Sequence, residues 1–192
     1  MDEHGVTIGE DGLARCPWGN GDPLYVGYHD QEWGRPVRGE DELFERICLE
    51  AFQSGLAWIT ILRKREAFRA GFAGFRIKQV AEFGDADVAR LLADEGIVRN
   101  RAKINASIAN ARAALALGGG LTELIWGHAP KGRRKAPAST QDVPAVTAES
   151  TALAKSLKQS GFVFVGPTTA YALMQACGLV NDHLAKCHVR KK

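Results

Sequence analysis

The sequence predicts an all-α fold. No segment sustains the strict alternation of apolar and polar residues that marks a half-buried strand, whereas several segments repeat apolar residues with the period of a helix. The chain has 192 residues and a hydrophobic content of 45%, which is enough to build a core in one domain or two small lobes. We therefore expect helices packed in a bundle-like array.

Each expected helix has a recognisable start or stop. Asp85 or Asp87 caps a short helix that stops at Gly96. Three glycines beginning at Gly118 end the clearest helix, and Pro167 fits the first position of the last one, where its missing N–H costs nothing. The expected helices cover residues 41–53, 56–68, a short segment ending at 92, 99–117, 147–160 and 167–177.

The N-terminus and one internal stretch are expected to lack regular structure. Residues 1–14 lack the apolar segment that a signal peptide requires. Their glycine and polar content predicts a disordered extension. A two-lobed helical domain is expected to follow over 15–192. Residues 131–144 are rich in proline and predict an exposed loop. No apolar run approaches the ~20 residues of a membrane span. These features predict a soluble, cytoplasmic protein with no membrane partner, and we expect a monomer.

Charge gives little guidance to the partner. The net charge is only +3, although basic residues cluster at 99–103, 131–135 and 190–192. Such clusters are usually solvated surface and less often contact phosphates. The sequence leaves the role of the 131–135 cluster open.

The four cysteines fall into two pairs. Cys48 and Cys177 lie on apolar helix faces and fit a core, where a free cysteine behaves as a small hydrophobe. Cys16 and Cys187 need another explanation. Because an intracellular chain rarely keeps a disulfide, metal binding is one alternative.

A metal site is suggested by two histidines near those outer cysteines. His29 lies thirteen residues after Cys16, and His183 lies four before Cys187, so on a helix the second pair would share a face. Two thiolates and two imidazoles suit tetrahedral zinc, which would be structural because no position stays open for water. The spacing alone fits a surface histidine beside an unpaired cysteine equally well, and His188 is a competing ligand.

A glycine-bounded turn separates the last two helices. Gly161 and Gly166 permit backbone conformations closed to other residues, and Thr168 follows at a helix start whose amides can meet a phosphate. This pattern is typical of a helix-hairpin-helix that holds a DNA backbone without reading its sequence. The alternative is an ordinary helical hairpin with Phe162 and Phe164 in the core.

One carboxylate and several aromatic residues gather in the N-terminal half. Glu50 follows Ile47 by three residues and Leu43 by seven, so it flanks the apolar stripe of its helix. Such a carboxylate is more commonly a surface side chain that folds outward. The alternative is the polar anchor of a pocket in which a flat ligand stacks between rings. The aromatic residues are Trp18, Tyr25, Tyr28, Trp33 and Trp58.

These motifs together resemble the DNA-3-methyladenine glycosylase I family of bacterial enzymes, within the helix-hairpin-helix DNA glycosylases. The resemblance covers residues 15–187 and includes the run Tyr-His-Asp-Gln-Glu-Trp-Gly at 28–34. Ordered matches of this length are far more specific than any one spacing. The other stretches that carry it are 16–18, 22–25, 47–60, 161–166 and 174–183.

The resemblance implies a helix-hairpin-helix glycosylase fold in which a structural zinc joins the termini. The ligand positions of the family are occupied here by Cys16, His29, His183 and Cys187. The implied activity is base-excision repair of alkylated double-stranded DNA. The enzyme would hydrolyse the N-glycosidic bond of 3-methyladenine and give free base and an abasic site.

The resemblance also implies roles for the pocket residues. Glu50 would be the catalytic group, and Tyr28 would join it in hydrogen-bonding the base. Trp58 would stack on the base, with Trp18 nearby. The remaining assignments are Gln53 to the base and Leu56, Gly161, Gly166 and Thr168 to the DNA.

Two departures from related glycosylases bear on mechanism. Asn181 stands where many relatives carry an aspartate that assists bond cleavage, and Thr168 stands where bifunctional relatives carry a Schiff-base lysine. We therefore expect no lyase activity. No residue is an unambiguous general base, and we do not assign that role to Asp182.

The expected mechanism needs little acid catalysis. The enzyme must extrude the base from the duplex, and methylation at N3 makes that base cationic and a better leaving group. The pocket need only favour the cation and the developing oxocarbenium ion. The alternatives are a non-catalytic zinc-stabilised nucleic-acid-binding module, a glycosylase with a broader lesion range, and a purely structural helical protein.

Overall fold

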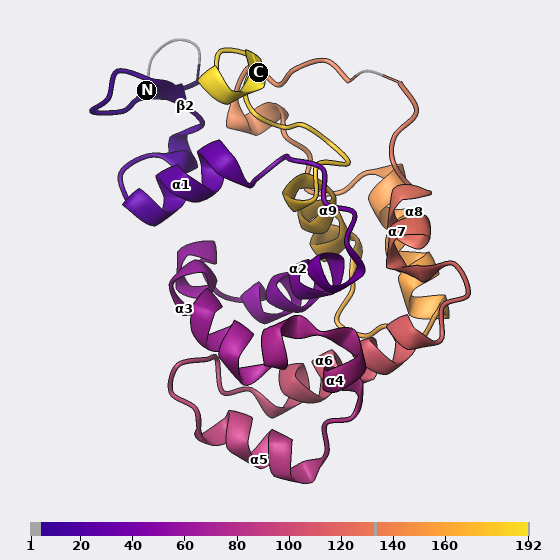
Figure 1. Cartoon of the computed structure of the whole chain (residues 1–192). Helices are drawn as coiled ribbons and strands as arrows, with labels where there is room; N and C mark the ends of the chain where they lie inside the picture. Colours follow the sequence, from indigo (N-terminus) through magenta and orange to yellow (C-terminus); the bar gives the residue numbers. More distant parts are fainter. Residues whose placement is uncertain (1–4, 133, 192) are drawn as a thin grey trace.

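The protein is built from helices arranged around one central helix. The computed structural model describes residues 5–132 and 134–191 (Figure 1). Two short strands, β1 (Thr7–Ile8) and β2 (Ala14–Arg15), precede the helices. The helices are α1 (Pro23–Gln31), α2 (Glu40–Gln53), α3 (Trp58–Gly71), α4 (Ile77–Ala81), α5 (Asp85–Ala93), α6 (Arg101–Leu115), α7 (Gly120–Trp126), α8 (Ala148–Gln159) and α9 (Pro167–Ala176), with 3-10 helices η1 (Pro17–Gly19), η2 (Ala73–Phe75), η3 (Thr140–Asp142) and η4 (His188–Lys191).

Helix α2 forms the centre of the core. Residues 43–52 are buried apart from Arg46, and the helix packs against α3, α6, α7 and α9. A helix surrounded in this way belongs in a protein interior. Its first turn carries Glu40, Asp41 and Glu42, whose negative charges stabilise the helix by interacting with the positive end of its dipole. The two acidic residues farther along it, Glu45 and Glu50, are therefore unusual and require an explanation.

Two groups of elements lie on opposite sides of α2. Helices α3 to α6 gather on one side, while α1 and the C-terminal segment lie on the other (Figure 1). The beginning and the end of the chain lie side by side, and β2 contacts η4. This arrangement brings residues from both ends of the sequence to one region of the molecule.

The all-α prediction is confirmed, and the six expected helices appear as α2, α3, α5, α6, α8 and α9. Three helices were not predicted. Helix α1 buries only Tyr28 and His29 and so shows no apolar stripe. Helix α4 has five residues, and α7 begins at Gly120, the last of the three glycines where a stop was expected.

The expected disorder of residues 1–14 is wrong for residues 5–14. Strands β1 and β2 pair antiparallel, with Thr7 opposite Arg15. Val6 is buried against Cys16, Leu184 and Cys187. A single apolar residue that meets distant partners leaves no periodic pattern in the sequence, which explains why the hairpin escaped prediction. Residues 1–4 lie outside the described part of the chain.

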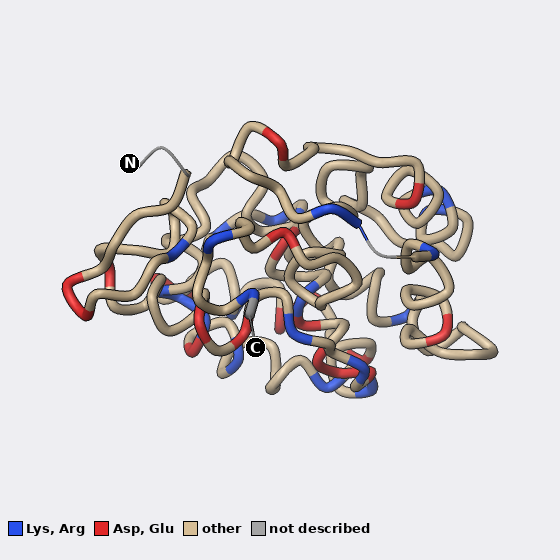
Figure 2. The backbone as a smooth tube through the Cα atoms, turned by 90° about the horizontal axis from the view of Figure 1, so that it is seen from above, with Lys and Arg blue, Asp and Glu red and all other residues tan. Residues whose placement is uncertain are grey.

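Charged residues are interspersed over the whole molecule. Basic and acidic positions are both found throughout the fold, and neither sign is confined to one part of it (Figure 2). Across residues 5–132 and 134–191, none of the helices has both the length and the apolar content that crossing a membrane requires.

Candidate functional site

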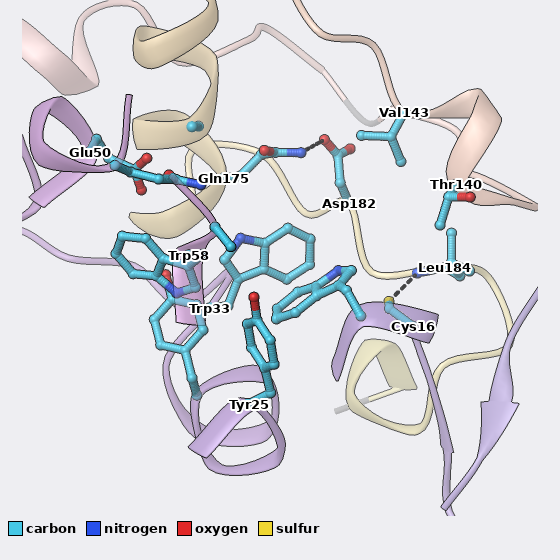
Figure 3. A pocket seen from close by; sticks show the side chains of 15 residues that line it. Cys16, Tyr25, Trp33, Glu50, Trp58, Thr140, Val143, Gln175, Asp182 and Leu184 are labelled. Atoms are coloured by element: carbon cyan, nitrogen blue, oxygen red, sulfur yellow. Dashed lines mark hydrogen bonds between the residues drawn. The ribbon is translucent and has the colours of Figure 1, made fainter. Parts of the chain in front are cut away.

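A cavity of about 480 Å³ lies between α1 and the core helices. Aromatic rings form one wall (Figure 3). The rings of Trp18 and Trp33 meet edge to face with centroids 4.9 Å apart, and Tyr28 and Trp58 lie 5.4 Å apart. The aromatic lining residues are Trp18, Tyr25, Tyr28, Trp33 and Trp58, which are those that the sequence placed in one group.

Glu50 lies in this cavity and is only 6% exposed, so it is not an outward-folding surface side chain. Burial raises the pKa of Glu50 to about 8, an effect that the nearby Arg46 only partly offsets. The carboxyl group is therefore largely protonated at neutral pH in the protein alone.

The groups around Glu50 are also shielded from water. Tyr28 is buried, and burial together with the neighbouring Glu50 raises the pKa of its hydroxyl above the ordinary range. Trp58 Nε1 and one Arg46 guanidinium nitrogen are buried without a hydrogen-bond partner among the described residues. An unpaired buried donor costs free energy, so the indole N–H of Trp58 is available to an acceptor on a bound molecule.

Asp182 occupies the end of the cavity opposite Glu50, with Gln175 between them (Figure 3). Its Oδ2 atom accepts hydrogen bonds from the Tyr171 hydroxyl and from Gln175 Nε2, the latter at 3.0 Å. Asn181, the residue aligned with the catalytic aspartate of other glycosylases, is exposed. Sequence reasoning did not identify Asp182 as a lining residue, because a one-residue difference in a loop decides which side chain turns inward. It also missed Gln175, which lies on α9.

The predicted loop at 131–144 supplies part of the wall. Thr140, at the start of η3, and Val143 line the cavity at the end occupied by Asp182. The segment is therefore not simply an exposed connection.

The other residues assigned from the sequence lie in or beside two turns. Gln53 lines the cavity, and Leu56 stands 41% exposed in a tight turn whose Gly55 has a φ of +83°. In the turn between α8 and α9, Gly161 has a φ of +91°, and Gly166 caps α9. Thr168, in the first turn of α9, is exposed.

The hairpin turn and the Leu56 turn border a second cavity of about 310 Å³. Phe162 is buried in the core as an ordinary hairpin would require, whereas Phe164 is 44% exposed. The lining residues are Ser54, Lys158, Phe164, Val165, Gly166 and Thr169. The two turns are therefore neighbours on one face.

The structure brings Cys16, His29, His183 and Cys187 into one buried cluster, with ligand atoms within 4.8 Å of one another. The His183 Nδ1 to His29 Nε2 distance is 3.2 Å, and Cys187 Sγ lies 3.5 Å from His29 Nε2. A hydrogen bond from the Cys16 thiol, with others from the two imidazoles, lowers the pKa of Cys187, which favours a thiolate. This cluster could hold a metal ion.

Groups outside the cluster fix both imidazole rings. The second nitrogen of His29 lies 2.7 Å from Asp30 Oδ1, and that of His183 lies 3.1 Å from the Trp33 carbonyl oxygen. Arg15 in turn donates to Asp30 through two nitrogens. Such outer partners orient histidine ligands in metal sites. His188 contacts Asp30 and stands outside the four-atom cluster.

His183 and Cys187 do not lie on a helix. Residues 183–187 form a turn, closed by a hydrogen bond from Cys187 N to Leu184 O at 2.9 Å. The two side chains converge because the chain reverses at this turn, and not because they share a helix face.

Comparisons with known proteins agree with one another. The methyladenine glycosylase family model matches residues 18–191. The chain is 48% identical over 179 residues to DNA-3-methyladenine glycosylase 1 of Escherichia coli K12, covering 91% of this chain and 96% of that one. It is 44% identical over 180 residues to DNA-3-methyladenine glycosylase of Haemophilus influenzae, with the same coverage.

A solved structure shows the same architecture. It comes from work on the structural basis of 3-methyladenine recognition by 3-methyladenine DNA glycosylase I of Staphylococcus aureus. The TM-score is 0.88 at 34% identity, and the alignment covers 93% of this chain and 97% of that one.

Proposed function

The chain belongs to the methyladenine glycosylase family, and from that premise we propose that it excises 3-methyladenine from alkylated DNA in base-excision repair. The observation that carries this proposal is a buried carboxyl, Glu50, in a cavity walled by aromatic rings. Such a cavity suits a flat cationic base. The products are free base and an abasic site. We expect no lyase activity, since Thr168 stands where lyases carry lysine.

The reaction needs little proton transfer because the substrate base is already cationic. When the bond between C1′ and N9 breaks, its electron pair goes to the base, which leaves as a neutral purine, and the positive charge moves to the sugar. Water then adds to C1′ and releases a proton. The protein contributes by extruding the base and holding it away from water.

We assign to Glu50 the discrimination between damaged and normal bases. Its pKa of about 8 reflects burial without a full charge partner. A cationic base beside it favours the carboxylate and lowers that pKa, whereas a neutral adenine cannot compensate a buried charge. The Tyr28 hydroxyl, which stays protonated, supplies a directional hydrogen bond.

The rings and the neighbouring amide position the base. We propose that Trp58 stacks on the base and that Trp18 closes the pocket beside it. Gln53 lies at the cavity lining where α2 ends and contacts the base or the space that the base vacates. Stacking of this kind is worth about 1–3 kcal/mol per base.

We propose that the Cys/His cluster binds one structural zinc per chain. Two sulfur and two nitrogen donors match the preference of zinc, and each imidazole is already held by an outer partner. Four protein ligands leave no position for water, so the ion would join the terminal segments and supply no chemistry at the pocket. Because Trp18 packs on His29, the ion would also support the pocket wall.

DNA would meet the face that carries the two turns. We propose that Leu56 enters the space left by the extruded base, while the backbone around Gly161, Gly166 and Thr168 holds phosphates. The base pocket then lies between two lobes, one on each side of α2. We expect a monomer to suffice because all of these residues come from one chain.

The decisive experiment measures base release from methylated duplex DNA and metal content on the same protein sample. We expect free 3-methyladenine, abasic sites without strand cleavage, and about one zinc per chain. Binding of the DNA without base release would leave a non-catalytic nucleic-acid-binding module and would overturn the proposal.

A further inference from the structure

Two buried polar residues of α6 take no part in the pocket or the metal cluster. Lys103 is 7% exposed and Asn110 is 1% exposed. They are seven residues apart, which is about two helical turns, so they share one face of the helix. A buried charge or amide is costly unless it is hydrogen-bonded, so the partners of these side chains indicate their role.

Lys103 holds the turn that carries Leu56. Its Nζ atom donates to the carbonyl oxygens of Phe52 at 2.8 Å and Ser54 at 2.7 Å. These carbonyls flank Gln53, and the amide of Leu56 donates to Gln53 O at 2.7 Å. The positive charge of Lys103 also interacts favourably with the negative, C-terminal end of the α2 dipole. The lysine therefore fixes the backbone from which Gln53 and Leu56 project.

Asn110 holds the tip of the hairpin turn in a comparable way. Its Nδ2 atom donates to Val163 O at 3.1 Å, and its Oδ1 atom accepts from Val163 N at 2.8 Å. Both backbone groups of Val163 are thereby satisfied by one side chain. The next residue, Phe164, has a φ of 57°, an uncommon conformation for a bulky residue that needs such support.

One face of α6 thus binds both turns that border the second cavity. The two anchors are separated by about 10 Å along the helix axis. Because α6 is embedded in the core, the turns cannot shift independently without breaking hydrogen bonds to it.

We propose that Lys103 and Asn110 are positioning residues that fix the spacing between the Leu56 turn and the hairpin tip. Insertion of Leu56 into the duplex and binding of the hairpin to the DNA backbone are thereby coupled. This inference rests on the proposed function, since it requires both turns to meet DNA. A preordered pair of loops avoids the free-energy cost of ordering them during binding. Neither residue contacts the base.

The test compares Lys103→Met and Asn110→Leu with a matched control, Ser107→Ala. Ser107 lies between the two anchors and is buried, and its side chain hydrogen-bonds to Lys103 O and to Cys48 of α2. The readout is the affinity for a duplex with a stable abasic-site analogue relative to the intact duplex. We expect this ratio to fall about tenfold for each anchor variant and to change less than about twofold for the control.

A double-mutant cycle with Leu56→Ala separates positioning from a general loss of stability. If Lys103 acts through Leu56, adding Lys103→Met to Leu56→Ala causes no further loss in the affinity ratio. Hydrogen exchange at the Leu56 amide should also be faster in Lys103→Met than in Ser107→Ala. If Lys103→Met melts below the assay temperature, Lys103→Gln, which keeps a donor, replaces it in the same cycle.

An unchanged affinity ratio in the folded anchor variants, or independent losses in the cycle, would overturn the inference. Failure of the proposed function is distinguishable, because it would appear as no release of 3-methyladenine by the unaltered chain.

Discussion

The aromatic pocket and the Cys/His cluster share a wall, yet their polar groups are satisfied to different degrees. Trp33 packs on His183 with ring centroids 4.6 Å apart, so the two sites are in contact. Within the cluster, each imidazole meets a partner through both of its nitrogens. In the pocket, the indole N–H of Trp58 has no partner in the described residues, and Glu50 has an abnormal pKa.

This difference indicates what each site is for. In the Cys/His cluster, a bound metal would satisfy all four donor atoms, so a further ligand would bring no gain in free energy. Such a site stabilises the fold. A pocket that keeps an unsatisfied donor and a neutralised acid gains free energy when a complementary molecule enters. The following predictions test this contrast, beginning with the largest effect.

Removing a cluster ligand should affect the whole protein. We expect Cys187→Ser to lose its metal and to lower the free energy of unfolding by about 4 kcal/mol or more, because a buried metal site is coupled to folding. Metal analysis and chemical denaturation measure both effects. Cys177→Ala is the control, since Cys177 is buried outside the cluster and should leave the metal content unchanged. A stable Cys187→Ser protein would remove the structural role.

Changing the acid of the pocket should affect activity and leave the fold intact. We expect Glu50→Gln to lower kcat/KM for 3-methyladenine release by about 100-fold or more, since an amide cannot ionise beside the cation. Glu45→Gln is the matched control on the same helix. Glu45 pairs with Arg69 and lies outside the pocket lining. Equal losses in the two variants would indicate a structural effect.

The same variant should reveal a pH dependence of stability. The pKa of Glu50 is about 8 in the folded chain, above the ordinary value of 4.5, so the folded state keeps a proton that the unfolded state releases. The contribution of Glu50 to the free energy of unfolding is fully present below about pH 4.5 and is lost as pH rises through 8. Relative to the unaltered chain, Glu50→Gln should therefore gain about 4 kcal/mol between pH 5 and pH 9. If the difference in unfolding free energy between Glu50→Gln and the unaltered chain stayed constant from pH 5 to pH 9, the raised pKa of Glu50 would be contradicted.

Prediction from sequence succeeded where the signal was local or carried by long motifs. Helical periodicity identified α2 and α6, and the resemblance placed Cys16 and Cys187 in one ligand set that the structure brings together. The two anchors on α6 escaped prediction because their partners are distant in the sequence. Lys103 donates to a carbonyl 51 residues away, and Asn110 donates to a carbonyl 53 residues away. A hydrogen bond to a distant backbone atom imposes no pattern on the sequence.

The state of Glu50 could not be predicted for a related reason. Position in an apolar stripe shows that a carboxyl is near the core, but its pKa depends on how completely distant segments cover it. Its neighbours include Tyr28 of α1 and Cys177 at the end of α9, which no spacing around Glu50 reveals.

The central claim is that Glu50 is a buried acid that is mostly protonated at neutral pH and ionises there when a cationic base enters. Titration of its side-chain carboxyl carbon by NMR in the free protein tests this most directly, with Glu50→Gln used to assign the signal. We expect a pKa of about 8. A pKa near the ordinary value of 4.5 would contradict the account.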